Sequence, residues 1–145
     1  MTAALFLVFH FVTGIVISVG LQRWDRRRLS PEELTWVWNA ATWGSAVYNF
    51  GVISLVAWGY VTRSPRYVVG LAHGVELALV ALFTQGLLNE AFGRIAGFHA
   101  GKLSQHRMEI VAQMGFCVAL SLVMALGRFV YEVIRRPRAS ASGAG

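Results

Sequence analysis

The sequence predicts an all-α fold, a four-helix transmembrane bundle with its N- and C-termini on the same side. Four apolar stretches fill most of the 145 residues, and 56% of the chain is hydrophobic against 14% charged. A helix needs about 20 predominantly apolar residues to cross a bilayer, and each stretch has that length. The stretches are residues 2–20, 34–61, 67–92 and 110–133.

The first helix is expected at about residues 2–22. Residues 5–20 carry no charged side chain on any face, whereas a helix of a soluble bundle shows one apolar stripe opposite a charged face. The segment Met1–Ala4 has no Lys or Arg before the apolar run, unlike the start of a signal peptide. We therefore expect this helix to be retained as a membrane span.

The second helix is expected at about residues 31–62. Ser30 is a typical N-cap, Pro31 suits the first helical position, and Glu33 completes a capping box three residues after the cap. The apolar run from Leu34 onward then continues without proline. One long helix that crosses the bilayer is the prediction for this segment.

The third and fourth helices are expected at about residues 65–93 and 104–136. Ser64 and Pro65 repeat the cap-and-proline signal, and Ser104 is a plausible cap for the fourth helix. Pro137 should end that helix, and the Ala/Ser/Gly-rich tail 138–145 should be disordered. Residues 1–137 thus form one membrane domain.

The net charge of +6 comes mainly from arginines at the ends of the apolar stretches. There they meet anionic lipid headgroups, so no nucleic-acid partner is needed to explain them. No cation precedes the first helix and four arginines follow it, which favours an N-terminus and C-terminus outside a bacterial-type inner membrane. With four crossings, however, the cations divide almost evenly between the two sides.

Three ionisable residues, His10, His73 and Glu76, are expected within the hydrocarbon layer, where such groups are costly and mark candidate sites. His10 and His73 lie equally deep in helices expected to run in the same direction. They are candidate axial ligands of a haem b or a chlorin held between two helices. The commoner role of such histidines is a hydrogen bond to a neighbouring helix.

Glu76 follows His73 by three residues, so the two side chains should share one helix face. The pair could form a proton relay or a quinone site, or a mutually satisfied neutral dyad. A weaker metal site is conceivable where the third helix ends and the fourth begins. Mixed imidazole and carboxylate ligands suit zinc, iron or manganese, and the residues concerned are Glu90, His99, His106 and Glu109.

The sequence lacks a phosphate-binding glycine loop, a Cys-x-x-Cys pair, a zinc-protease motif and a nucleophile elbow. A catalytic role is therefore not expected. Small-residue faces centred on Gly44, Gly70, Gly74 and Gly115 allow close helix approach. We expect a non-catalytic subunit that docks against other membrane proteins, such as an energy-transducing complex, or against itself. The alternatives are a haem-binding redox subunit using His10 and His73, and an oligomeric proton-coupled transporter or channel centred on Glu76.

Overall fold

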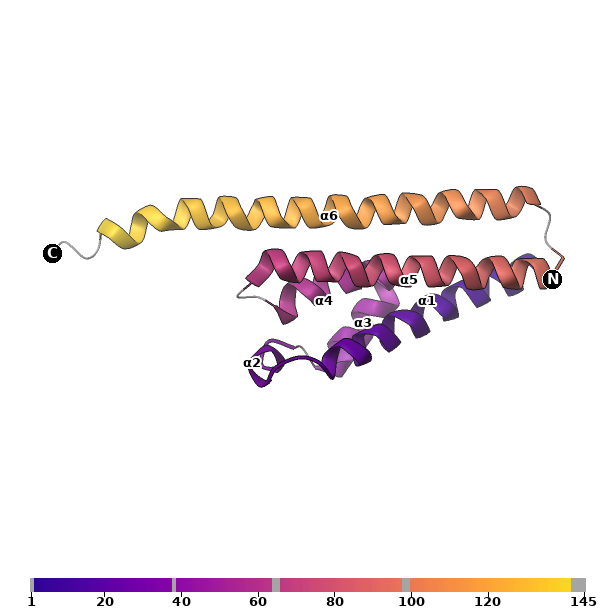
Figure 1. Cartoon of the computed structure of the whole chain (residues 1–145), viewed down its shortest axis with the longest axis horizontal. Helices are drawn as coiled ribbons and strands as arrows, with labels where there is room; N and C mark the ends of the chain where they lie inside the picture. The colour runs from indigo at the N-terminus through magenta and orange to yellow at the C-terminus, as the bar shows by residue number, and fades with distance from the viewer. Residues whose placement is uncertain (1, 38, 64–65, 98–99, 142–145) are drawn as a thin grey trace.

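Helix α5 (Tyr67–Ile95) is the central element of the computed structural model, and α1, α4 and α6 all pack against it (Figure 1). The structure describes residues 2–37, 39–63, 66–97 and 100–141, without the side chains of 2–3, 40, 100–106 and 135–141. All regular structure in these ranges is helical. The remaining elements are α1 (Thr2–Arg26), α2 (Pro31–Leu34), α3 (Ala40–Phe50), the 3-10 helix η1 (Gly51–Ile53), α4 (Ser54–Thr62) and α6 (Ala100–Ala141).

Four segments are long and apolar enough to cross a membrane, as the sequence predicts: Ala4–Arg26, Ala41–Thr62, Tyr67–Ile95 and Arg107–Ile134. The contact between α4 and α5 is mainly apolar. Leu55 and Val56 of α4 and Ala78, Ala81 and Leu82 of α5 are completely buried. The core therefore lies mainly along the contact between α4 and α5.

Helices α1 and α5 run antiparallel. Near the start of α1, the ring of Phe9 stacks on that of Phe92, with centroids 4.2 Å apart. Near its end, Oδ1 of Asp25 lies 2.9 Å from Nε2 of His73. We call these two ends of the molecule the Phe92 end and the Asp25 end.

The second apolar segment does not form one crossing helix, so the prediction of a continuous helix over 31–62 is wrong. In an unbroken helix Trp43 and Trp58 would lie about 22 Å apart, yet their ring centroids are 4.8 Å apart. The chain turns back at Gly51, which has φ +54°, a conformation that costs little only for glycine. Helices α3 and α4 thus form a hairpin that starts and ends at the Asp25 end.

The start of this hairpin follows from local capping. The capping box at Ser30 is confirmed, with its hydroxyl accepting from the Glu33 amide and the Glu33 carboxylate accepting from the Ser30 amide. The helix it starts, α2, nevertheless ends at Leu34. Asn39 then caps α3, because its Oδ1 accepts a hydrogen bond of 2.8 Å from the Thr42 amide.

Because the hairpin does not cross, the described chain runs from one end of the molecule to the other three times rather than four. Helix α6 is antiparallel to α5: Arg107 bonds Glu90 near one end, and the Arg128 guanidinium lies over the Tyr67 ring near the other. Helix α1 therefore begins at the Phe92 end and α6 finishes at the Asp25 end (Figure 1). This arrangement contradicts the prediction that both termini lie on one side.

Three glycines bring α4 and α5 into backbone contact. A Cβ atom added at Gly59 would lie 2.6 Å from the Gly74 nitrogen, and one added at Gly74 would lie 2.8 Å from the Leu55 carbonyl oxygen. An added Cβ at Gly70 would also meet Gly59. Gly70 and Gly74 are thus used inside the molecule and are not free for the docking that their spacing suggested.

The predicted boundaries of the last two helices are only partly met. Helix α5 begins at Tyr67, and the expected cap at Ser64 and Pro65 lies outside the described residues. Helix α6 begins at Ala100, so Ser104 is inside it, and the helix passes Pro137 to Ala141. Near a helix end a proline removes only one backbone hydrogen bond and need not stop the helix. The tail beyond 141 lies outside the described residues.

Candidate functional site

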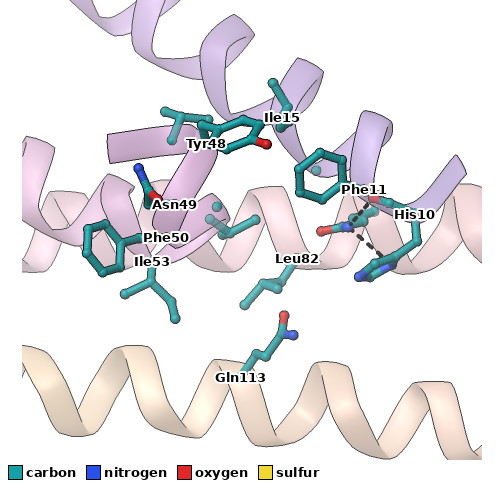
Figure 2. Close-up of a pocket in the computed structure, with 14 residues that line it drawn as sticks. His10, Phe11, Ile15, Tyr48, Asn49, Phe50, Ile53, Leu82 and Gln113 are labelled. Carbon is teal, nitrogen blue, oxygen red and sulfur yellow. Dashed lines mark hydrogen bonds between the residues drawn. The ribbon is translucent and has the colours of Figure 1, made fainter. Parts of the chain in front are cut away.

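A pocket of about 180 Å³ opens where the tip of the hairpin meets α1, α5 and α6 (Figure 2). We call it the hairpin pocket. It lies near the middle of α5, at Leu82 and Gln85. Its lining residues are His10, Phe11, Gly14, Ile15, Val47, Tyr48, Asn49, Phe50, Gly51, Val52, Ile53, Leu82, Gln85 and Gln113.

His10 is held at the edge of this pocket by two amides of α5. Nδ2 of Asn89 lies 2.9 Å from the imidazole Nδ1, and Nε2 of Gln85 lies 3.3 Å from the same atom. Gln85 also donates to the His10 carbonyl oxygen at 2.9 Å. Because both amide groups are donors, Nδ1 is the accepting nitrogen, and the neutral imidazole carries its proton on Nε2.

The polar groups around the pocket are neutral hydrogen-bonding groups. His10 and Gln85 come from α1 and α5, Asn49 comes from α3, and Gln113 extends from α6 toward Leu82 (Figure 2). None of the described residues that line the pocket is acidic, lysine or arginine. The site is therefore suited to a neutral solute that both donates and accepts hydrogen bonds.

The unwound backbone at the hairpin tip contributes to the same site. The helical ladder of α3 ends at Phe50, Gly51 takes its positive φ, and η1 continues as a short 3-10 turn before α4. Phe11 of α1 contacts this tip through an edge-on contact with Tyr48, with ring centroids 5.9 Å apart. The break in the helix thus lies against the pocket rather than in a surface loop.

A second polar group surrounds Asp25, whose side chain is only 1% exposed. Trp58 Nε1 donates to Oδ2 at 2.8 Å. Arg63 donates from Nη2 to Oδ1 at 2.9 Å and from Nη1 to Oδ2 at 3.2 Å. His73 Nε2 contacts Oδ1 at 2.9 Å. We call these four residues the Asp25 cluster.

The Asp25 cluster joins α1, α4 and α5 at one end of the molecule. A buried carboxylate with four close donors has its hydrogen-bonding capacity filled. The arrangement is therefore typical of a structural interaction that holds the three helices together, and not of a reactive site. Sequence reasoning missed Asp25, because it follows the first apolar run among four arginines and looks like part of a solvated turn. Only the reversal of the hairpin brings Trp58 and Arg63 to it.

The predicted His73 and Glu76 pair is confirmed as a pair on one helix face, with His73 Nδ1 3.3 Å from Glu76 Oε2. The Glu76 side chain is 71% exposed and does not line the hairpin pocket. Glu76 instead lines a different pocket, together with Leu21, Trp24 and His73.

The structure does not bring His10 and His73 together. His73 contacts Asp25, and His10 precedes Asp25 on α1 by about 15 residues, or about 22 Å of helix. The prediction of equal depth assumed that α1 and α5 run in the same direction, and they run in opposite directions. These positions do not allow the two imidazoles to ligate one haem or chlorin.

The predicted metal ligands are not assembled in the described part of the chain. Glu90 accepts hydrogen bonds from Arg94 at 2.5 Å and from Arg107 at 2.6 Å, so its carboxylate is engaged by cations. His99 lies outside the described residues, as does the side chain of His106, and Glu109 is exposed. Within the described ranges, no group of three or more His, Cys, Asp and Glu residues could hold a metal ion.

Two groups of residues therefore merit attention, the hairpin pocket and the Asp25 cluster. The first offers space beside polar side chains from four helices, and the second holds the hairpin in place. No protein-family model, curated protein or solved structure matches the chain.

Proposed function

We propose that the protein is an integral membrane protein that binds a small neutral polar solute in the hairpin pocket and lets it cross the bilayer. One observation carries this proposal: halfway along the bundle, the helix break at Gly51 lies against a pocket that holds polar side chains from four helices. Non-helical backbone at membrane depth is tolerated where it is buried in protein or lines a cavity. Interrupted helices that meet near the bilayer midplane form the substrate sites of many transporters.

The depth of the pocket supports this assignment. Leu82 and Gln85 lie near the midpoint of α5, which at 29 residues is about as long as a bilayer is thick, with its polar edges included. Polar side chains at that depth are expensive and are expected to serve a function. Gln85, which is only 4% exposed, is the clearest example.

The size and chemistry of the pocket define the solute class. Its volume of about 180 Å³ is far more than a single water molecule needs and matches a small solute. Amide and imidazole groups supply donors and acceptors, while Phe11, Tyr48 and Phe50 supply apolar walls. Water, glycerol and urea are therefore suitable probes.

The corrected topology also supports an orientation. Three crossings leave Arg94, Lys102 and Arg107 at the Phe92 end, and the rest of the 13 lysine and arginine residues at or near the Asp25 end. This asymmetry is much larger than the even division expected for four crossings. By the positive-inside rule the Asp25 end faces the cytoplasm, with the start of α1 outside and the end of α6 inside. The N-terminus is thus outside, as the sequence predicts, whereas the C-terminus is inside rather than outside.

Permeation in proteoliposomes tests the proposed function. Vesicles with and without the protein are exposed to osmotic gradients of glycerol or urea, and their swelling is followed by light scattering. We expect faster swelling with the protein, and a loss of about tenfold in Gln85→Leu, the rate equivalent of one lost hydrogen bond of about 1.4 kcal/mol. Swelling no faster than in protein-free vesicles for every probe, water included, would overturn the proposal.

A matched pair of glycine variants sharpens this test. A Cβ added at Gly14 would lie 2.9 Å from Gln85 Nε2, whereas nothing lies within 4 Å of one added at Gly20 on the same helix. The Gln85 side chain can move aside, so Gly14→Ala should fold but disturb the pocket. We expect slower permeation in Gly14→Ala and normal permeation in Gly20→Ala.

The same vesicles, loaded with a pH dye, test the alternative of a proton path through Glu76. Proton flux through the unaltered protein is compared with proton flux through Glu76→Gln.

A second candidate function is docking against another membrane protein, and the exposed face of α3 favours it. Thr42, Ser45 and Asn49 recur at helical spacing and are all exposed in the single chain. Thr42 and Asn49 make hydrogen bonds within α3 and its cap, and their remaining polar atoms are available to a neighbouring helix. Gly44 on α3 and Gly115 on α6 also have open space beside them. Crosslinking from Asn49→Cys in native membranes tests this candidate, and a lipid-facing α3 without crosslinked products would argue against it.

A further inference from the structure

A separate pocket of about 300 Å³ lies at the Asp25 end, between α1 and the α3–α4 hairpin. We call it the arginine pocket. Gln22, Arg23 and Arg26 line it from α1, and Trp43 and Trp58 line it from the hairpin. None of these five residues lines the hairpin pocket.

Gln22 contributes a buried hydrogen-bond donor that has no acceptor. The residue is only 6% exposed, and its Nε2 atom has no hydrogen-bond partner among the described residues. A buried amide without an acceptor is destabilising, and buried polar groups of native proteins are almost always paired. The position of Gln22 in the pocket lining therefore indicates that the pocket receives an acceptor.

Two arginines indicate that the ligand which supplies this acceptor is negatively charged. Arg23 and Arg26 are exposed, and within the part of the chain that the structure describes neither makes an ion pair or side-chain hydrogen bond. The nearest acid in sequence is Asp25, but its oxygens are engaged by Trp58, Arg63 and His73. Two guanidinium groups beside an amide donor favour an anion such as phosphate, which accepts several hydrogen bonds at once.

The remaining walls are apolar. Val19, Trp43 and Trp58 border the same pocket, and Trp43 and Trp58 are almost completely buried. The pocket lies where the apolar run of α1 gives way to arginines, which is the depth of the lipid headgroups in a membrane-spanning arrangement. A ligand that combines a phosphate with an apolar portion matches both kinds of wall.

We propose that the arginine pocket binds the phosphate group of an anionic lipid, with Gln22 Nε2, Arg23 and Arg26 as the binding groups. The chemistry recognised is a phosphate anion, which a lipid headgroup or a free phosphate compound can supply. The apolar walls favour the lipid. This site does not depend on transport through the hairpin pocket, and the two proposals are tested by different measurements.

The experiment compares melting temperatures of the delipidated protein in a neutral detergent with one of three additions: phosphatidylglycerol, phosphatidylcholine or soluble glycerol phosphate. We expect phosphatidylglycerol to raise the melting temperature and phosphatidylcholine to leave it unchanged, since a ligand that binds only the folded state stabilises it. An equal shift with glycerol phosphate would assign the site to free phosphate compounds and overturn the lipid as ligand. No shift with either phosphate source would overturn the site itself.

Charge-matched variants separate a specific site from general attraction to an anionic surface. The double variant Arg23→Gln/Arg26→Gln removes the same charge as Arg27→Gln/Arg28→Gln, whose arginines do not line the pocket. We expect the first to weaken phosphatidylglycerol binding by about fivefold for each arginine, measured by titration of the melting shift, and the second to weaken it far less. Equal weakening in both would overturn the proposal.

Gln22→Met provides a test that is independent of charge, because methionine has nearly the same shape and no donor. Removing an unpaired buried donor should raise the melting temperature without lipid and reduce the further rise that phosphatidylglycerol causes. A higher melting temperature together with an undiminished lipid effect would exclude Gln22 from the site.

Discussion

The guanidinium Nη2 of Arg63 lies 2.9 Å from Oδ1 of Asp25, although 38 residues separate the two in sequence. Asp25 lies in the last turn of α1 and Arg63 follows α4, so this ion pair places both helix ends at the same end of the molecule. The segment between them must therefore enter and return. The ion pair is therefore direct evidence that the α3–α4 hairpin reverses. The hairpin pocket, the arginine pocket and the proposed membrane orientation all depend on this reversal.

Labelling of single cysteines tests that reversal directly. In a Cys117→Ala background, Arg28→Cys and Arg66→Cys should react with a membrane-impermeant maleimide from the same side of the membrane. Ile95→Cys, 87% exposed at the Phe92 end, should react only from the other side. Reaction of positions 28 and 66 from opposite sides would show four crossings and contradict the hairpin.

Replacing Asp25 by alanine should destabilise the protein strongly. The change leaves Arg63, Trp58 and His73 without their shared acceptor, and the loss of one partner of a buried ion pair costs about 3 kcal/mol or more. Unfolding in mild detergent, titrated with a denaturing detergent, measures the loss. The double variant Asp25→Leu/Arg63→Leu should lose less, because it leaves no unpaired charge.

Glu76→Gln is the control for the Asp25 cluster. Glu76 contacts the same histidine, but its side chain is 71% exposed, and exposed ion pairs contribute less than about 1 kcal/mol. We expect a small change in stability. A loss as large as that of Asp25→Ala would mean that Glu76, and not Asp25, is the residue on which the cluster depends.

Gly74→Ala should separate α4 from α5. Its added Cβ would lie 2.8 Å from the backbone carbonyl oxygens of Leu55 and Val56, and backbone atoms cannot move aside as a flexible side chain can. Overpacking of this kind costs about 1–3 kcal/mol. Gly115→Ala, with open space around the added atom, should be neutral or slightly stabilising, because alanine is the better helix former. Equal stability of the two variants would contradict the close packing of α4 on α5.

Gly51→Ala should destabilise the hairpin tip for a different reason. No atom obstructs a Cβ at Gly51, but its φ of +54° is strained for any other residue, at a cost of about 1–3 kcal/mol. Because Gly51 lines the hairpin pocket, permeation should fall together with stability. Unchanged unfolding and permeation would indicate that the chain does not reverse at this residue.

Much of the helical content could be predicted from sequence, and so could the Ser30 capping box and the pairing of His73 with Glu76. Each of these depends on interactions among residues no more than four apart. His10 was recognised as a functional candidate because it is a costly residue in an apolar run. Its actual partners, Gln85 and Asn89, lie 75 and 79 residues away, and no local pattern identifies them.

The sequence by itself determined that four segments are apolar enough for a membrane, since hydropathy measures the solvent that each segment prefers. Only the tertiary structure decided the direction of each segment. Whether residues 40–62 cross or turn back depends on one glycine conformation, one tryptophan contact and the pairing of Asp25 with Arg63. Hydropathy is the same for both paths, because it sums side chains without regard to which of them meet. That difference in path moved His73 away from His10 and brought it to Asp25.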